Sequence, residues 1–347
     1  MTDRTMPANK GSAPIPNLWS RDGFSGMNAI ALRSDYTPTY LKVKGPHAPH
    51  RFCIMELQTE DMTSAEAMPT PVLTGRSGLM LSVSRRKEPT PFAMRNTEGD
   101  ELHFIQSGAV RFVTDFGVIE AGRLDFVHIP RAITYRVEPL SSDLTALILT
   151  SPGPLNFDTP APFGMINFGK AVRKPTIDTG LSEGPKRLLV RAFDGATEFE
   201  MGHDPIRALM QVGGKEPVWA LNLRDIVPLS YGERGGPPGQ FLSTADTGVM
   251  SFTLSARPGP RPPVHVNADY DEIILYAEGP GAWGKISDPG TVTWVPKGVT
   301  HHGPVEDVPE GYQAWLLEVR ETMRLSPEAL RLARLMETSE YGFQPGA

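Results

Sequence analysis

The sequence predicts an all-β fold: two similar β domains in tandem, followed by a C-terminal helix. Glycine and proline contribute 34 residues each to a chain of 347, which argues against a helical bundle and favours short strands joined by turns. Strand-like runs gather in two blocks separated by a stretch rich in Pro and Gly. A local pattern recurs in both blocks, which indicates two related domains.

The predicted strands are short runs rich in Val, Ile, Phe, Trp and Thr and bounded by Gly or Pro. In the N-terminal barrel, residues 51–150, they are Leu79–Val83, Glu101–Ile105, Val110–Thr114, Asp125–Ile129 and Thr145–Thr150. In the C-terminal barrel, residues 218–320, they are Val218–Leu221, Gly248–Ala256, Glu272–Tyr276, Thr291–Val295 and Gln313–Val319. These runs are too short and too regularly interrupted for a helical fold.

Three segments lie outside the predicted barrels. Residues 1–50 form an N-terminal extension, and residues 151–217 form an interdomain connection that packs on the domains and contains a strand at Arg187–Phe193. Residues 321–347 form a C-terminal helix and tail. Ser326 is the expected N-cap of this helix, Pro327 its first residue, and Leu335–Met336 the end of its apolar stripe.

Composition narrows the functional classes. Lys and Arg total 34 against 40 for Asp and Glu, a net charge of −6, so we expect no nucleic-acid partner. The lone cysteine, Cys53, excludes an intrachain disulfide and a Cys-rich zinc site and suits a reducing, cytoplasmic location. No apolar run long enough for a membrane span or a signal peptide is present, so we expect no membrane partner.

The internal repeat rests on four matches in the same order. In each block an Asn precedes a Glu by five residues, an Asp-Glu pair opens a strand, a Gly follows seven residues after the Glu, and an apolar residue precedes a later Pro. The matches are Asn96 with Asn267, Asp100-Glu101 with Asp271-Glu272, Gly108 with Gly279, and Ile129-Pro130 with Val295-Pro296. A repeat of about 170 residues indicates duplicated domains rather than a solenoid.

The C-terminal block carries a set of metal-ligand residues. His265 and Asn267 stand two residues apart on one strand, Glu272 opens the next strand, and His301 follows Pro296 in a Pro-x-Gly-x-x-His turn. Alternate residues of a barrel strand point inward, so these side chains can meet. A lone Glu or His is usually an ordinary surface or loop residue. Two imidazoles and one carboxylate on one face, however, are the ligand set of non-haem Fe(II) enzymes.

The choice between two adjacent histidines stays open. The Pro-x-Gly-x-x-His spacing selects His301, whereas the His302-Gly-Pro tripeptide selects His302. We prefer His301, because Tyr135 holds the same place after Pro130 in the first repeat. His302 then becomes a second-shell or substrate contact and, with Tyr276, a candidate catalytic base. Asn267 becomes a weak extra ligand or orients the substrate.

The N-terminal block lacks this set. Met94 stands where His265 stands and Tyr135 where His301 stands, so only the carboxylate of Glu101 remains. We therefore expect a metal-free, structural first barrel. His103 and His128 on its strands are expected to be ordinary half-buried histidines.

The two segments of the second block resemble the two cupin motifs, and the chain resembles the homogentisate 1,2-dioxygenase family, a branch of the bicupins. The resemblance rests on Trp219–Pro228, His265–Glu272, His302–Pro304, Asp100-Glu101 and Phe116-Gly117. It implies the bicupin fold, two double-stranded β-helix (jelly-roll) barrels in tandem. It also implies a mononuclear Fe(II) that, with O2, cleaves a small aromatic diol whose hydroxyls are para to each other. The loop Gly235–Phe241 has no histidine where the homogentisate enzymes carry a catalytic one, and the chain is shorter than those enzymes. Hydroquinone or a substituted hydroquinone therefore fits at least as well as homogentisate.

The resemblance also implies partners. Single-chain bicupins often associate, so we expect a homo-oligomer. The large subunit of two-component hydroquinone dioxygenases is similar in length, which implies a small partner subunit as a further component. The alternative functions are another metal-dependent bicupin enzyme or a non-catalytic metal-binding cupin protein. A Gly-x-Gly-x-x-Gly match at Gly279–Gly284 is followed by no helix, so no dinucleotide cofactor is expected.

Overall fold

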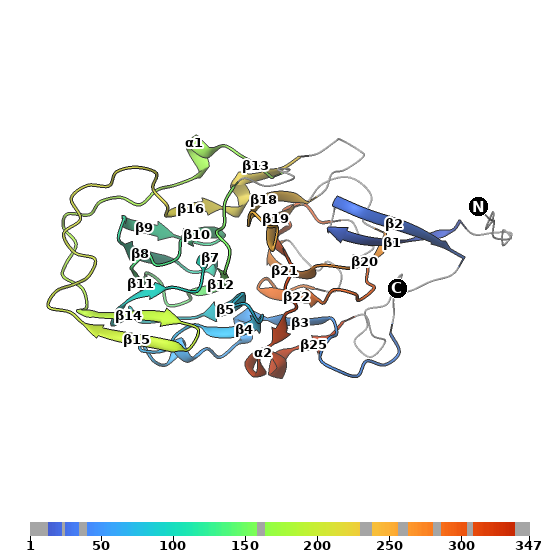
Figure 1. Ribbon diagram of the computed structural model, residues 1–347, viewed down its shortest axis with the longest axis horizontal. Helices are drawn as coiled ribbons and strands as arrows, with labels where there is room; N and C mark the ends of the chain where they lie inside the picture. Colours follow the sequence, from blue (N-terminus) through green and yellow to red (C-terminus); the bar gives the residue numbers. More distant parts are fainter. Residues whose placement is uncertain are drawn as a thin grey trace.

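The computed structural model describes residues 13–22, 25–34, 40–157, 164–229, 238–255, 263–279, 286–303 and 308–336. It is a β-protein whose two barrels lie side by side along the long axis (Figure 1). The two α-helices of this part of the chain are short: α1 (Phe168–Ala171) and α2 (Pro327–Leu332). Neither these nor any other helix in the described ranges is long and apolar enough to cross a membrane. The predicted all-β fold of two barrels in tandem is confirmed.

The N-terminal barrel consists of a seven-stranded and a six-stranded sheet. The larger sheet has the order β16-β10-β7-β12-β5-β4-β24 and the smaller β15-β14-β6-β11-β8-β9. Their strands are β4 (Thr70–Thr74), β5 (Met80–Ser84), β6 (Ala93–Asn96), β7 (Asp100–Ser107), β8 (Val110–Thr114), β9 (Gly117–Ala121), β10 (Asp125–Ile129), β11 (Tyr135–Pro139), β12 (Thr145–Ser151), β14 (Arg187–Ala192), β15 (Gly195–Glu200), β16 (Trp219–Asn222) and β24 (Arg324–Leu325). Every strand predicted for this block is present, with ends shifted by at most two residues.

The C-terminal barrel pairs a seven-stranded sheet, β18-β19-β23-β21-β22-β3-β25, with a three-stranded sheet, β2-β1-β20. Its strands are β1 (Ile15–Asp22), β2 (Ser25–Arg33), β3 (His50–Cys53), β18 (Gly239–Ser243), β19 (Val249–Ser255), β20 (Val264–Asn267), β21 (Asp271–Glu278), β22 (Thr291–Val295), β23 (Gln313–Val319) and β25 (Arg334–Leu335). A separate two-stranded sheet joins β13 (Gly164–Ile166) to β17 (Ile226–Pro228). The predicted strands of this block are also present; the end of one of them, Ala256, lies outside the described residues.

The two large sheets pack against each other and form the main core. Alternate residues of β7 and β10 meet alternate residues of β21 and β23, as the period of two in a strand requires. The rings of Phe104 and Phe126 lie 5.6 Å and 5.2 Å from that of Trp315, between centroids. The opposite face of each large sheet lines the interior of its own barrel.

The strand pairing departs from the predicted domain division at both boundaries. β3 lies in the range predicted for the first barrel but pairs with β22 of the second. β16 lies in the range predicted for the second barrel but pairs with β10 of the first. β24, near the C-terminus, pairs with β4. The barrels therefore exchange strands.

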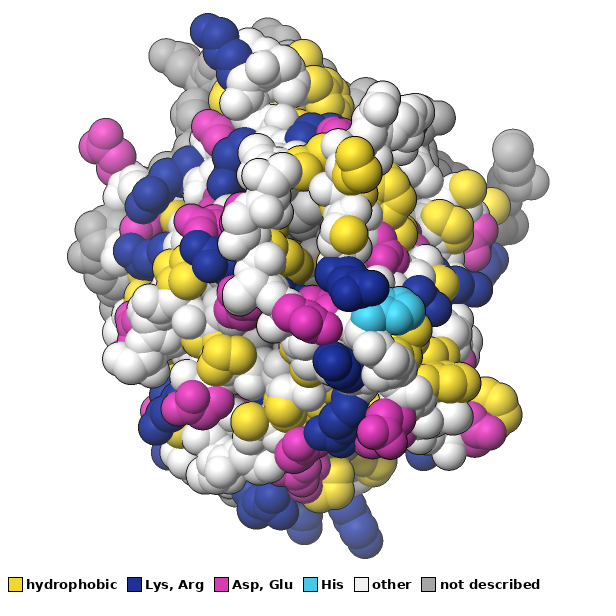
Figure 2. Space-filling model, turned by 90° about the vertical axis from the view of Figure 1, so that its left-hand side faces the viewer, with side chains coloured by type: hydrophobic (Ala, Val, Ile, Leu, Met, Phe, Trp, Pro, Cys, Tyr) yellow, Lys and Arg dark blue, Asp and Glu magenta, His cyan; other side chains and the backbone are white. Residues whose placement is uncertain are grey.

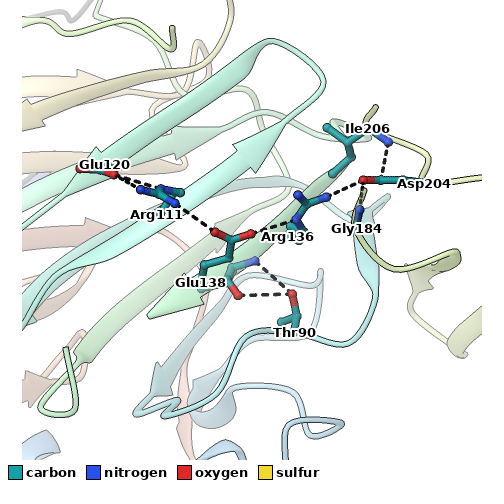
Figure 3. A network of polar contacts seen from close by, with 9 residues as sticks. Thr90, Arg111, Glu120, Arg136, Glu138, Gly184, Asp204 and Ile206 are labelled. Atoms are coloured by element: carbon teal, nitrogen blue, oxygen red, sulfur yellow. Dashed lines mark hydrogen bonds and ion pairs between the residues drawn. The ribbon is translucent and has the colours of Figure 1, made fainter. Parts of the chain in front are cut away.

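The connecting segment is bound to the first barrel by a buried ion pair (Figure 3). The Arg136 guanidinium donates to Asp204 Oδ2 at 2.8 Å and to Glu138 at 3.1 Å. Asp204 in turn accepts the backbone N–H groups of Gly184 and Ile206. The strand predicted inside this segment is β14, which with β15 extends the six-stranded sheet.

The outer end of the first barrel has a mixed surface. In Figure 2, Lys and Arg side chains on this face are interspersed with Asp and Glu side chains. The Arg187 guanidinium, for example, contacts Glu66 at 2.8 Å and Glu198 at 2.7 Å.

Two terminal elements differ from expectation. The extension contains a hairpin, β1–β2, whose first strand pairs in parallel with β20. At the other end Ser326 Oγ caps α2 as predicted, accepting from Ala329 N at 3.1 Å. The helix ends at Leu332, earlier than the predicted apolar stripe, because Arg334–Leu335 pairs with β3 as β25.

Candidate metal centre

Strand β20 carries two of the expected residues into the second barrel. His265 and Asn267 are buried, whereas Val264 and Val266 between them are half-buried, as the alternation of a strand requires. β1 supports this strand from its other edge: Ala268 N donates to Ser20 O at 2.8 Å, and Ser20 Oγ donates to Asn267 Oδ1 at 3.3 Å. The N-terminal hairpin thus holds the strand of His265 and Asn267 in place.

A tight turn returns His301 to this strand. Gly298 has a φ of +78°, the left-handed conformation that glycine adopts readily, and its N–H donates to Asn267 O at 2.8 Å. The backbones of His265 and His301 then exchange two hydrogen bonds of 2.9 Å. This is the physical reason for the Pro-x-Gly-x-x-His spacing, since the turn places the histidine opposite β20.

Three side chains converge at this point. One ligand atom each of His265, Glu272 and His301 lies within 4.8 Å of the others, and the cluster is the one group of this kind in the described residues. His301 Nε2 is 3.8 Å from Glu272 Oε1, and the two imidazole centroids are 4.2 Å apart. The three come from β20, β21 and the turn after β22.

The hydrogen bonds of the imidazoles fix their tautomers. His265 Nδ1 lies 2.8 Å from Pro263 O and His301 Nδ1 3.0 Å from Val299 O. A carbonyl only accepts, so each Nδ1 carries the proton and each Nε2 presents a lone pair. Within the described chain, the buried His301 Nε2 has no hydrogen-bond partner. Such a lone pair fits a metal ion.

Burial keeps these histidines uncharged. Burial lowers the pKa of His265 to about 4, and the neighbouring His301 adds to the effect. Burial likewise lowers the pKa of His301 to about 4. Burial raises the pKa of Glu272, and His265 opposes that rise. Two neutral imidazoles and a carboxylate can therefore hold a divalent cation with positions left open for other ligands.

The remaining predicted residues lie around the cluster or away from it. His302 is half-buried next to His301, is not a member of the cluster, and its Nδ1 lies 2.6 Å from Gly303 O. Tyr276 is four residues after Glu272, roughly 13 Å along an extended strand, and stacks on Tyr312 at 5.2 Å. The structure therefore does not bring Tyr276 to the cluster. Pro304, Gly235–Pro237 and most of Gly279–Gly284 lie outside the described residues.

The sequence interpretation did not single out Glu318. This residue is fully buried on β23, directly opposite Glu272 in the strand ladder. Burial, and then the charge of Glu272, raise the pKa of Glu318 to about 8. A lone glutamate in an apolar strand carries no spacing signal, so only its pairing partner could have indicated it.

The first barrel repeats the backbone of this site with different side chains. Tyr135 pairs with Met94 as His301 pairs with His265. Ala132 takes the place of Gly298, with a φ of +63°, and its N–H donates to Asn96 O at the same 2.8 Å. The predicted duplication therefore extends to the turn itself.

The carboxylate of the first barrel is fully occupied. Tyr135 Oη donates to Glu101 Oε2 at 2.5 Å and Asn96 Nδ2 donates to Oε1 at 2.9 Å. His103 and Arg191 lie 3.7 Å and 3.8 Å away. His103 is buried rather than half-buried, as is His128, whose Nε2 lies 3.1 Å from Asp100 Oδ2.

Comparison with known proteins supports the expected relationship. No protein-family model matches the chain. Over 243 residues, 65% of this chain, it is 26% identical to a protein of Saccharolobus solfataricus whose name calls it a dioxygenase and gives no substrate. It is 24% identical over 144 residues, 41% of the chain, to homogentisate 1,2-dioxygenase of Pseudomonas putida. Over 46 residues, 13% of the chain, it is 46% identical to the same enzyme of Rhodopseudomonas palustris.

These matches cover 62%, 33% and 10% of the three relatives, so the chain spans less than two thirds of the length of each. The predicted resemblance to the homogentisate 1,2-dioxygenase family is confirmed. Among solved structures, a mutant of Bacillus subtilis oxalate decarboxylase is 13% identical with a TM-score of 0.41, over 82% of this chain and 79% of that one.

A cupin 2 conserved barrel domain protein from Leptotrichia buccalis is 12% identical with a TM-score of 0.41, over 76% of this chain and 98% of that one. The fold follows from the strand topology itself.

Proposed function

We propose that this protein is a non-haem Fe(II) dioxygenase that cleaves the ring of a para-dihydroxylated aromatic compound. Homogentisate, hydroquinone and substituted hydroquinones are the proposed substrates. The observation that carries the proposal is the convergence of two neutral imidazoles and one carboxylate within 4.8 Å of one another inside a β-barrel. The dioxygenase names of the relatives support the same class of reaction.

In this proposal His265, Glu272 and His301 hold the iron. Bound Fe(II) would supply redox chemistry between the aromatic diol and O2. The protein contributes fixed ligand orientation, because the carbonyls of Pro263 and Val299 accept from Nδ1 of the two histidines and keep Nε2 aimed inward.

His302 is the proposed base for the substrate hydroxyl. Because its Nδ1 donates to Gly303 O at 2.6 Å, Nε2 is the nitrogen that accepts a proton. Tyr276, the other candidate, lies four residues further along β21 and away from the cluster. Asn267, buried on the same strand face as His265, would orient the substrate. We expect His302→Gln to keep its iron and to lose about 10²- to 10⁴-fold in kcat, which steady-state O2 consumption measures.

The test of the proposed function is anaerobic purification, metal analysis and O2 consumption with homogentisate, gentisate, hydroquinone and methylhydroquinone. Stoichiometric iron together with O2 uptake on one diol is the expected result. Iron without uptake on any of the four would favour another cupin chemistry or a missing partner subunit. A purified chain that binds no divalent metal would contradict the proposal.

The association of this chain with further copies, and with a small partner subunit, stays a prediction. The edge strand β2 exposes Met27, Ile30 and Leu32, between 60% and 66% accessible, which is consistent with contact to a second copy. Light scattering of the purified chain measures the number of copies. A monomer at micromolar concentration would contradict the homo-oligomer.

A further inference from the structure

Glu318 is a buried carboxyl that the proposed mechanism does not use. Its residue accessibility is 0%, and neither carboxyl oxygen has a hydrogen-bond partner among the described residues. Burying a carboxyl without a donor costs several kcal/mol, so such a group takes a proton, a water molecule or a cation as its partner. Its surroundings indicate which of these it takes.

Those surroundings place Glu318 beside the cluster. It is the direct cross-strand partner of Glu272, and residues opposite each other in an antiparallel pair project from the same face of the sheet. Its other cross-strand neighbour is Met250, and Ile274 and Leu316 occupy the next rung on that face. Two carboxyl groups thus stand side by side on an otherwise apolar wall.

The other barrel shows that this arrangement is specific to the second one. The residue opposite Glu101 is Thr150, so only one carboxyl lies on that rung. Glu101 also has donors from Asn96 and Tyr135, whereas Glu318 accepts none within the described ranges. A structural carboxyl of this fold therefore has the donors that Glu318 lacks.

We propose that Glu318 belongs to the metal centre, as a second carboxylate that binds the hydration water of a divalent cation held by His265, Glu272 and His301. Glu318 is not part of the group whose ligand atoms lie within 4.8 Å of one another, so it acts through water rather than as a direct ligand. It is a positioning residue that offers an acceptor for that water behind Glu272. The inference rests on the proposed function, because it requires a cation at that site.

Metal titration of the full chain tests the inference. Wild type, Glu318→Gln and Glu318→Leu are treated with chelator and titrated with Mn(II), and with Fe(II) under anaerobic conditions, by calorimetry. We expect both variants to bind about 10- to 100-fold more weakly than wild type, the usual loss when a residue behind a ligand is removed. We also expect chelator-treated Glu318→Leu to melt at a higher temperature than chelator-treated wild type, since an unpartnered buried carboxyl is gone.

Weaker metal binding together with a higher melting temperature is a pair of effects that a purely structural carboxyl would not produce. Glu101→Gln is the matched control: it should melt at a lower temperature and bind metal as wild type does. Binding by both Glu318 variants within about twofold of wild type would overturn the inference. Absence of metal binding by wild type would instead overturn the proposed function. If Glu318→Leu does not fold, the isosteric Glu318→Gln decides the outcome.

Discussion

Each barrel has a glutamate at the second position of an equivalent strand, β7 or β21, but the two glutamates have different neighbours. Glu101 receives hydrogen bonds from Tyr135 and Asn96, with Arg191 close by. Glu272 faces two neutral imidazoles and a second carboxyl, that of Glu318. The backbone turn is the same in both barrels, so the difference lies in side chains alone. A metal centre on this scaffold requires lone pairs, and the first barrel has a thioether, Met94, and a phenol, Tyr135, in place of the two imidazoles. The phenol donates its proton to the glutamate.

The largest effect on metal affinity is expected when one imidazole of the cluster is removed. His265→Ala should reduce divalent-metal affinity by more than the roughly 100-fold loss expected for a residue behind a ligand, because an imidazole of the cluster is gone. Metal content after dialysis, by elemental analysis, measures this. The matched variant is Met94→Ala in the first barrel, which should lose about 2–5 kcal/mol of stability and keep its metal. Full metal content in His265→Ala would refute the ligand assignment.

Lowering the pH should remove the stabilisation that the ionised carboxylate of Glu101 gives to the folded protein. Burial alone would raise the pKa of Glu101, but His103, Arg191 and Tyr135 outweigh burial and lower it to about 2 from 4.5. Folded Glu101 therefore binds fewer protons than unfolded Glu101 between these two values. Its stabilisation is complete above pH 4.5 and is lost as the pH falls through about 2.

This stabilisation is on the order of 3 kcal/mol. Urea unfolding of wild type and Glu101→Gln between about pH 6 and about pH 3 measures it, because the free-energy difference between them should shrink as the pH falls. The histidines of the other barrel titrate in both proteins and cancel in the difference. A constant difference across this range would mean that Glu101 is not held ionised by its donors.

A smaller effect is expected from removing one donor. Tyr135→Phe should cost about 1–3 kcal/mol of unfolding free energy, because a buried carboxylate oxygen loses its 2.5 Å hydrogen bond. Metal affinity should not change, since the first barrel is expected to hold no metal. Chemical denaturation and metal titration of the same preparation check both statements. A weaker metal affinity would show that the barrels are coupled.

The smallest effect concerns the shared turn. Ala132 holds a left-handed φ of +63°, whereas its counterpart Gly298 holds +78° without strain. Ala132→Gly should therefore stabilise the protein by about 0.5–1 kcal/mol, and Gly298→Ala should destabilise it by about 1–2 kcal/mol. A Cβ at Gly298 would meet nothing within 4 Å, so its cost is purely conformational. Thermal melts measure both, and equal signs would contradict the equivalence of the turns.

Much of this architecture could be predicted from local sequence. The strands carry their period in their own residues, which is why β8, β10, β22 and β23 begin and end where expected. The Pro-x-Gly-x-x-His spacing encodes a turn that a few backbone hydrogen bonds determine. The repeat predicts that Tyr135 corresponds to His301, and the structure gives the two residues equivalent pairing partners, Met94 and His265. These features depend on neighbours in the chain.

Features that depend on distant partners could not be predicted. The residues of β16 predict a strand but not the sheet that it joins, and β3 is not among the predicted strands. The hairpin β1–β2 sits in a polar, Pro-rich extension, and its stability comes from β20, which lies about 250 residues later in the chain. In the sequence Glu318 is an ordinary polar position in a strand, and only its pairing with Glu272 distinguishes it. Which strands pair with each other is determined by the tertiary structure and not by local sequence.

Because strands are exchanged, neither barrel can complete its large sheet before the other has been synthesised. β3 is synthesised before the first barrel yet belongs to the second, and β24 follows the second yet belongs to the first. Synthesis must reach β24 and β25 before the two large sheets have all their described strands. A gene fragment encoding one barrel would produce an open sheet edge, and such edges aggregate. We therefore expect neither half of the chain to complete its sheet when it is made alone.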